Sequence, residues 1–273
     1  LNWTTISRLY ELAYRCTMCR RCVQACPMGV DNGLITHELR KLFSQELGWA
    51  PRELHEKGTM LQLKVGSSTG MSPKVVKDNM EFIDEDYTEL TGFDVVTPWD
   101  REEADVLLIH NAGEILSWPE NPAAFTILLN AAGISWTLAS DDPAYDGVNY
   151  GLFYDDVQLA RIALKHAEVA KKLKVKKIVM GECGHQHKAL MTIADRILLG
   201  DMNIPRESCF VTLDEIISSG RIKVDPSRNP QRVTFHDSCN NARSCGFYEE
   251  PRELLQLVTM DFEEMTPNRA ENY

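Results

Sequence analysis

The residues with the clearest chemistry are four cysteines near the start of the printed sequence. They are Cys16, Cys19, Cys22 and Cys26, and Pro27 follows the last of them. The spacing C-x2-C-x2-C-x3-C-P is that of bacterial ferredoxins, in which three of these thiolates bind one cluster and the fourth serves a neighbouring cluster. A zinc site and a disulfide pair are the alternatives, but zinc sites usually hold two C-x2-C pairs apart by a longer loop. The run therefore predicts a [4Fe–4S] cluster.

Two further cysteines each follow an expected strand. Cys183 comes after the apolar stretch 177–180 and just before an expected helix, and Cys239 comes after the stretch 232–235. Ligands of open α/β sheets gather at the carboxyl ends of the strands, and a helix N-terminus favours a thiolate. We therefore expect both cysteines to be cluster ligands, with a buried apolar thiol as the alternative.

Two histidines adjoin these expected ligands, namely His185 and His236. Near a thiol/disulfide site a histidine could deliver a proton. It could equally donate a hydrogen bond to a cluster sulfide or a backbone group and so tune the reduction potential. Both roles stay open. Cys209 and Cys245 lie outside these motifs and are expected to be ordinary thiols, and of the two Cys245 is the better candidate for an exception.

Composition narrows the class of protein. Of the 273 residues, 44% are hydrophobic and 25% are charged, as in ordinary globular proteins. The printed sequence has no run of about eighteen apolar residues, so we expect no segment in it that spans a bilayer. A formal net charge of -11 argues against nucleic acid as a partner. Eight cysteines are too sparse for a disulfide scaffold, which favours a reducing compartment and metal thiolates.

The first hundred residues have the pattern of helices. Apolar residues recur at helical spacing over 3–15, 34–47 and 51–63. A breaker-rich loop at 66–73 then leads to a short helix and an acidic segment over 81–89. The buried stripe expected for the second helix consists of Leu34, Ile35, Leu39, Leu42, Phe43 and Leu47. We therefore expect the cluster to lie between helices.

From about residue 100 strands alternate with helices. The expected strands are 105–110, 134–138, 177–180 and 232–235, and the expected helices are 122–132, 155–173, 186–199, 251–260 and a short one that ends at 218. This alternation predicts an α/β domain with a mainly parallel sheet. The fold class is thus α+β, with a helical ferredoxin module over 1–65, a linker with a helical segment over 66–100 and the α/β domain over 101–273.

The α/β part contains a degenerate internal repeat. Residues 108–113 are similar to residues 234–239, and each stretch is followed by a helix that starts at a proline, Pro122 or Pro251. A repeated strand, loop and helix indicates a duplicated unit. Only the second copy has a cysteine at the end of the strand, because Gly113 stands where Cys239 stands in the other. We infer that one copy keeps a metal site and the other has become scaffold.

On these residues the chain resembles the catalytic subunit of heterodisulfide reductase and its relatives. Those relatives include DsrK-like subunits and iron–sulfur quinone oxidoreductases that serve electron-transferring flavoprotein. The resemblance is carried by residues 16–30, by Gly181-Glu182-Cys183-Gly184-His185, and by residues 235–239 followed by Glu250-Pro251-Arg252. It implies a helical ferredoxin module with two cysteine motifs. It also implies a CCG-type domain, two cysteine-rich repeats that in some members hold a catalytic four-iron cluster.

The printed sequence departs from the family pattern in an informative way. Its one ferredoxin motif is similar to the family's second, so we expect the first to lie upstream of Leu1. The resemblance then implies that Cys16, Cys19 and Cys22 hold one cluster and that Cys26 reaches a neighbouring one.

The CCG repeats also depart from the family pattern. Residues 139–142 stand where the first repeat's paired cysteines are expected, and the second repeat's Cys-Cys-Gly is expected beyond Tyr273. The α/β domain is therefore expected to be truncated at its C-terminal end.

The resemblance implies an enzyme, an iron–sulfur oxidoreductase subunit of a membrane-associated respiratory complex. Electrons would pass between [4Fe–4S] clusters and a CCG-held cluster for thiol/disulfide chemistry. The implied partners are a membrane cytochrome b-like or quinone-reactive subunit and other redox subunits, and the implied location is cytoplasmic, on the inner face of the membrane. A relay between flavoprotein and quinone pool without catalysis of its own is the alternative, and a zinc site at Cys183 is a third hypothesis.

Overall fold

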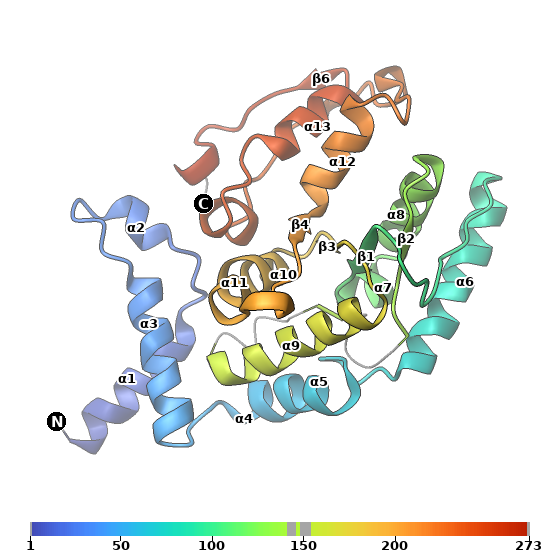
Figure 1. Cartoon of the computed structure of the whole chain (residues 1–273). Coiled ribbons are helices and arrows are strands. Elements are labelled where there is room, and N and C mark those ends of the chain that lie inside the picture. The colour runs from blue at the N-terminus through green and yellow to red at the C-terminus, as the bar shows by residue number, and fades with distance from the viewer. Residues whose placement is uncertain (1, 141–145, 148–153, 272–273) are drawn as a thin grey trace.

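Helices make up the N-terminal part of the protein in the computed structural model, which describes residues 2–140, 146–147 and 154–271. In Figure 1 the first three helices lie at the end marked N, and the next ones continue along the molecule toward its opposite end. Helices α1 (Trp3–Arg15), α2 (Arg21–Ala25) and α3 (Asn32–Lys41) come first, and α3 continues as a π-helical turn over Leu42–Glu46. A second helical stretch consists of α4 (Arg52–Leu54), a π-helical turn (His55–Thr59) and α5 (Met60–Val65). These positions confirm the helices expected over 3–15, 34–47 and 51–63.

Helix α6 (Pro73–Thr91) is longer than expected, because it includes the acidic segment 81–89. Its ends explain its length. The hydroxyl of Ser72 caps the first turn by accepting from the amide of Val75, and Pro73 occupies the first helical turn, where no amide donor is needed. Gly92, with φ of 72°, ends the helix in the left-handed conformation.

Helix α3 buries a different face from the one expected. Leu34, Ile35, Leu42 and Leu47 are about half exposed, with relative exposures of 54%, 50%, 50% and 48%. The buried positions are instead Gly33, Thr36, His37 and Arg40, which recur at helical spacing. Phe43 is buried as expected, at 4% exposed, but the prediction was wrong for these four residues because polar side chains on the other face make long-range contacts. The imidazole of His37, for example, lies 3.0 Å from the carboxylate of Asp156.

A four-stranded parallel sheet forms the centre of the C-terminal part. Its strands are β1 (Val106–Ile109), β2 (Trp136–Thr137), β3 (Lys177–Met180) and β4 (Arg206–Ser208), in the spatial order β2-β1-β3-β4. The helices between them are α7 (Ala112–Ser117), α8 (Glu120–Ala131), α9 (Asp156–Lys172), α10 (Gly184–His187) and α11 (Ala194–Ile197), and α12 (Cys209–Ser218) follows β4. The expected mixture of helices with a parallel sheet is therefore confirmed.

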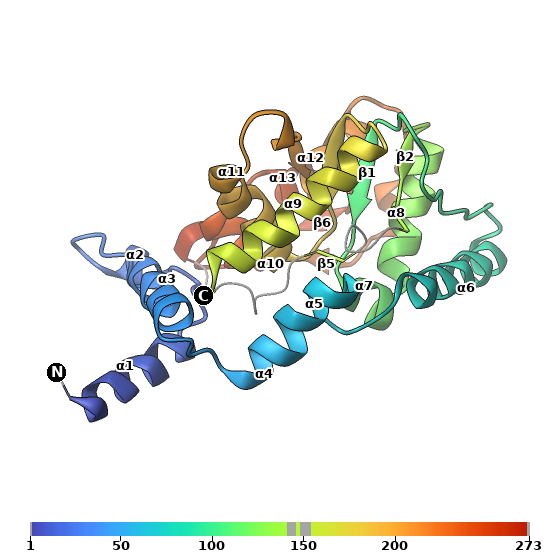
Figure 2. The ribbon, with the colours of Figure 1, turned by 60° about the horizontal axis from the view of Figure 1, so that its bottom comes forward.

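Alternate residues of β1 point into two hydrophobic cores, one on each face of the sheet. Leu107 and Ile109 pack in a core with the buried face of α9, whereas Val106 and Leu108 pack in a core with residues of α6, α7, α8 and α12. Figure 2 shows α9 crossing one face and α8 lying on the other side of the strands. The strand order changes direction between β1 and β3, and such a point is where open α/β sheets bind ligands.

The strand expected over 232–235 lies outside this sheet. Strand β5 (Arg232–Val233) pairs with β6 (Asp261–Phe262) in a separate two-stranded parallel sheet, with helix α13 (Glu250–Val258) between them. In the same way β1 pairs in parallel with β2, and α8 lies between them. Both copies of the sequence repeat therefore have the order strand, helix and parallel strand. Residues 141 and 142, in the segment expected to replace paired cysteines, lie outside the described residues.

Candidate iron–sulfur site

The ferredoxin-like cysteine run forms the connection between α1 and α3. Cys16 follows the last residue of α1, the short helix α2 carries Cys22, and the amide of Cys26 donates to the carbonyl of Cys22 at 3.0 Å. Met18 and Arg20 have positive φ angles of 57° and 60° in the loop between α1 and α2. This conformation is uncommon for residues other than glycine. All eight cysteines are free thiols, and the four in this run are partly exposed.

Backbone amides point toward the sulfur atoms of this run. The amide of Met18 donates to Sγ of Cys16 at 3.3 Å. Amides of Val30, Met28 and Gly29 lower the pKa of Cys26 by hydrogen bonding to its sulfur. Hydrogen bonds of this kind to sulfur are among the features that set the properties of iron–sulfur clusters. The disulfide alternative therefore does not fit, and the donors suit thiolate ligands.

The pKa of Cys19 is also lowered. Partial burial acts in the opposite direction, but the amide of Arg21, the hydroxyl of Thr17 and the charge of Arg243 outweigh it. Within the described residues, no three His, Cys, Asp or Glu side chains already converge as a metal site. The fit of this run to a cluster therefore rests on the chemistry of its donors.

Three cationic side chains from distant elements donate to carbonyl groups of the cysteine run. Arg40 on α3 donates to the carbonyls of Ala13, at 2.9 Å, and of Cys16. Nζ of Lys188 donates to the carbonyl of Met18 at 2.8 Å, and Nε of Arg243 donates to that of Cys19 at 2.8 Å. Lys188 begins the π-helical turn Lys188–Ile193 after α10, and Arg243 lies in the π-helical turn Asn240–Ser244. Residues of the α/β part thus hold the cysteine run in place.

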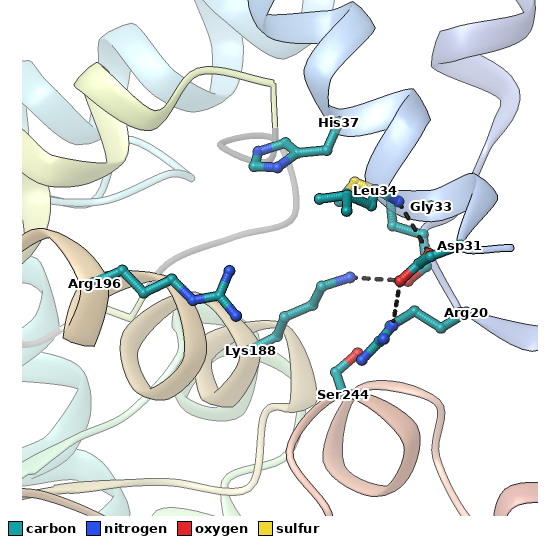
Figure 3. A pocket seen from close by; sticks show the side chains of 9 residues that line it. Arg20, Asp31, Gly33, Leu34, His37, Lys188, Arg196 and Ser244 are labelled. Atoms are coloured by element: carbon teal, nitrogen blue, oxygen red, sulfur yellow. Dashed lines mark hydrogen bonds and ion pairs between the residues drawn. The ribbon is translucent and has the colours of Figure 1, made fainter. Parts of the chain in front are cut away.

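A cavity of about 180 Å³ lies where these elements meet. Figure 3 shows Lys188 and Arg196 entering it from the α/β part, and Arg20, Asp31 and His37 from the N-terminal helices. Arg20 and Asp31 form an ion pair at 2.9 Å.

Cys183 and Cys239 lie on segments that touch each other. A Cβ atom placed on Gly184 would be only 3.1 Å from Cβ of Asn240, and Nδ2 of Asn241 donates to the carbonyl of Glu182 at 3.5 Å. These contacts join the residues flanking the two cysteines.

Lys188 connects these segments electrostatically to the cysteine run. Burial lowers its pKa, whereas the thiols of Cys239, Cys245 and Cys16 are close enough to oppose that shift. All three cysteine-bearing parts of the chain therefore meet around one lysine. Sequence reasoning assigned no role to Lys188 and predicted that Cys245 is an ordinary thiol.

The carboxyl ends of β1 and β3 form a buried polar cluster next to Cys183. Nδ1 of His110 lies 2.6 Å from Oε2 of Glu114, and both side chains are 1% exposed. Position 181 must be glycine here, because a Cβ atom would lie 2.6 Å from that carboxylate oxygen. Burial, with the charges of Glu114 and Glu182, raises the pKa of Cys183 to about 11. Without a metal, this thiol is therefore protonated at neutral pH.

The two histidines proposed for catalysis differ in their surroundings. His185 is partly buried on α10, and its pKa is lowered by burial and by the charge of Lys188. His236 is exposed. A third histidine, His187, is the last residue of α10. It is fully buried, with Nδ1 2.9 Å from the carbonyl of Cys183 and Nε2 2.8 Å from the hydroxyl of Ser208.

An ion pair that sequence reasoning missed fixes the segment before Cys239. Arg252 donates two hydrogen bonds to the carboxylate of Asp237, at 2.7 and 2.8 Å, and both side chains are almost completely buried. Arg252 also donates to Glu264 at 2.5 and 3.0 Å. Asp237 and Arg252 belong to the two stretches at 235–239 and 250–252 that carry the family resemblance, so this pair joins those stretches in space.

These features define a class of protein. Four free thiols have ferredoxin spacing, and three of them, Cys16, Cys19 and Cys26, receive amide hydrogen bonds. They lie against an α/β part that brings two more cysteine-bearing segments to the same place. This is an iron–sulfur protein, and the cysteine run binds a [4Fe–4S] cluster.

The comparisons with known proteins agree with this class. Over 97% of its length the chain is 27% identical to the Hdr-like menaquinol oxidoreductase iron–sulfur subunit 2 of Archaeoglobus fulgidus, of which it covers 54%. It is 24% identical to one subunit of the dihydromethanophenazine:CoB–CoM heterodisulfide reductase of Methanosarcina mazei, over 89% of the chain and 56% of the relative. It is 23% identical to the EtfAB:quinone oxidoreductase of Syntrophomonas wolfei, over 91% of the chain and 34% of the relative.

The chain is similar to heterodisulfide reductase-like iron–sulfur proteins. It spans 54% of the length of its menaquinol oxidoreductase relative, about half. No protein-family model matches it, and neither does any solved structure. Within the described residues, no helix has both the length and the apolar character that crossing a bilayer requires.

Proposed function

We propose that this chain is part of an iron–sulfur oxidoreductase subunit in a membrane-associated complex, and that its α/β part holds a second cluster for thiol/disulfide chemistry. The observation that carries the proposal is the meeting of the Cys16–Cys26 run with the segments of Cys183 and Cys239 around Lys188. An electron pathway needs such closeness between its sites. In this proposal residues 1–65 form a cluster module, residues 66–100 form a connecting segment, and residues 101–273 form a CCG-type domain.

Six of the eight cysteines have a proposed role. Cys16, Cys19 and Cys22 hold the ferredoxin-type cluster, Cys26 serves a neighbouring cluster, and Cys183 and Cys239 contribute to the second site. A [4Fe–4S] cluster supplies or accepts one electron at a time. Reduction of a disulfide consumes two electrons and two protons and yields two thiols, and oxidation reverses this balance.

The protons of this reaction would pass through His185 or His236. His185 is the better supported of the two, because it is partly buried beside Cys183, whereas His236 faces solvent. A hydrogen-bonding role toward a cluster sulfide or the backbone is the alternative for both.

The proposed partners are a membrane cytochrome b-like or quinone-reactive subunit and other redox subunits. Two relatives support this assignment, since their names describe a menaquinol oxidoreductase and a quinone oxidoreductase. The proposed location follows from these partners: cytoplasmic, peripheral on the inner face of the membrane.

A relay function is the second candidate. The chain would then transfer electrons between a flavoprotein and the quinone pool without catalysis of its own, as suits the similarity to an EtfAB:quinone oxidoreductase. In this case the segments of Cys183 and Cys239 would be structural, or Cys183 would belong to a zinc site.

Metal analysis of cysteine variants separates these functions. For the thiol/disulfide function, Cys239→Ser should lose about four irons while the EPR signal of the ferredoxin-type cluster remains, and thiol oxidation should give a new paramagnetic species only in the parent protein. Cys209→Ser is the matched control, because Cys209 is buried and donates to the carbonyl of Gly181 at 3.4 Å. If Cys239→Ser kept its iron and no new paramagnetic species formed, the thiol/disulfide function would be excluded in favour of the relay function. If Cys183→Ser lost zinc, Cys183 would belong to a zinc site.

A further inference from the structure

Three cations hold three carbonyl groups within four residues of the cysteine run. Arg40, Lys188 and Arg243 donate to the carbonyls of Cys16, Met18 and Cys19, respectively. We call Arg40, Lys188 and Arg243 the cation clasp. Arg40 comes from the same helical part as the run, but the other two come from the α/β part, 170 and 224 residues away from their acceptors. Two of the three hydrogen bonds therefore exist only while the two parts are packed together.

The cation clasp places buried positive charges in a chain with a negative net charge. Lys188 is 6% exposed and Arg40 is 8% exposed, in a chain whose net charge is -11. Burying a cation costs free energy unless anionic or strongly polar groups compensate for it. Groups around Lys188 include the carbonyl of Met18, the side chains of Cys16, Cys239 and Cys245, and the cation Arg20, which is itself paired with Asp31. Cys16, a proposed ligand of the ferredoxin-type cluster, and Cys239, proposed for the second site, are among the groups that offset this charge when they are ionised.

A cation close to an iron–sulfur cluster raises the reduction potential of the cluster. A cluster bound by thiolates becomes more negative when it takes up an electron, so a fixed positive charge beside it stabilises the reduced state and raises its reduction potential. Burial strengthens the effect, because a buried charge is screened less by water and salt.

We propose that Lys188 and Arg243 are positioning residues that order the cysteine run and raise the reduction potential of the cluster held by Cys16, Cys19 and Cys22. The docking of the α/β part then sets the potential of a cluster bound by the N-terminal part. The inference rests on the ferredoxin-type cluster and is independent of whether a second cluster or a thiol substrate exists.

The test is a potentiometric EPR titration of the full chain with its clusters, comparing Lys188→Met with Lys188→Arg. Loss of the charge should lower the one-electron equilibrium constant for reduction about tenfold, which is ~59 mV, while arginine should keep it near the parent value. Lys57→Met is the matched control, because Lys57 is exposed and pairs with Glu53 on its own helical stretch. Equal midpoints in the parent and in Lys188→Met would overturn the electrostatic half of the proposal.

A second measurement tests whether Lys188 and Arg243 order the cysteine run, and it does not require a bound cluster. Hydrogen exchange of the backbone amides of residues 16–20 in the cluster-free chain should speed up at least tenfold in Lys188→Met and in Arg243→Met, but not in Lys57→Met. Arg243→Lys should restore part of the protection, since it keeps a cationic donor. If Lys188→Met does not fold, the Arg243→Met and Arg243→Lys pair decides both halves. Unchanged exchange in this pair would overturn the positioning role, whatever the iron content of the α/β part.

Discussion

At the scale of single residues, Asp146 joins the two parts of the molecule. Its carboxylate accepts from the amide of Ser68, at 2.8 Å, and from the amide of Ala112, the first residue of α7, at 3.0 Å. Its backbone carbonyl lies 3.2 Å from Nε2 of His166 on α9. The side chain is 0% exposed. A single buried carboxyl group thus caps a helix of the α/β part and binds the loop after α5.

The burial of Asp146 predicts a pH dependence of stability. Burial raises the pKa of this carboxyl group from 3.8 to about 6, although the hydrogen bonds from Ser68 and Ala112 act against the shift. A raised pKa means that the folded state binds the proton more tightly, so this contribution is complete below about pH 4 and is lost as the pH rises through about 6. The free energy of unfolding should fall over that window by up to about 3 kcal/mol, at about 1.4 kcal/mol per pKa unit.

Urea unfolding of the parent protein and Asp146→Asn at a series of pH values measures this effect. The amide cannot ionise, so the difference between the two proteins should change between about pH 4 and 6 and be constant outside that range. A difference that is independent of pH would show that the carboxyl group of Asp146 has the same pKa in the folded and the unfolded states.

At the scale of elements, the ion pair of Asp237 and Arg252 connects α13 to the segment that carries Cys239. Arg252→Leu should leave a buried carboxylate without its partner and should lower the free energy of unfolding by about 3–5 kcal/mol. Arg232→Leu is the control, because the side chain of Arg232 is 67% exposed although it also pairs with two carboxylates, and it should cost about 1 kcal/mol or less. Urea titration gives both values, and similar losses for the two variants would contradict a special role for the buried pair.

The elements themselves could be predicted where local pattern decides them. The observed strand β3 has the expected limits 177–180, and α1 has the expected limits 3–15. Strand β4 was missed because its three residues carry no apolar run, and the buried face of α3 was wrong because distant partners bury His37 and Arg40. Sequence pattern reports local propensity, whereas the choice between two faces of a helix depends on tertiary contacts.

The candidate site could be predicted in the same partial way. The cysteine run is a local motif, so its spacing alone indicates a cluster. Lys188 and Arg243 carry no such signal, because each acts on a carbonyl group far away in the sequence. Arg252 and Lys188 are buried, although a sequence pattern would place charged residues like these at the surface.

At the scale of the whole molecule, the helical part and the α/β part share a buried contact at Tyr154. Its hydroxyl donates to Oγ1 of Thr59 at 2.9 Å and lies 2.8 Å from Nδ1 of His55, while its carbonyl accepts from Ser44 at 3.0 Å. Tyr154 is 2% exposed and Thr59 is 1% exposed. We therefore expect the two parts to behave as one folding unit.

Unfolding of the full chain should then be a single cooperative transition. Tyr154→Phe should lower the free energy of unfolding by about 1–2 kcal/mol, since it leaves the buried Thr59 and the partly buried His55 without the hydroxyl. The loss should be the same by every probe. Tyr87→Phe, on α6, removes a hydroxyl outside this contact and serves as the control. The probes are circular dichroism for the helices and hydrogen exchange for the strands of the sheet. If Tyr154→Phe shifted the transition of the helices and left that of the sheet unchanged, the parts would fold separately, and the cation clasp would join two independent domains.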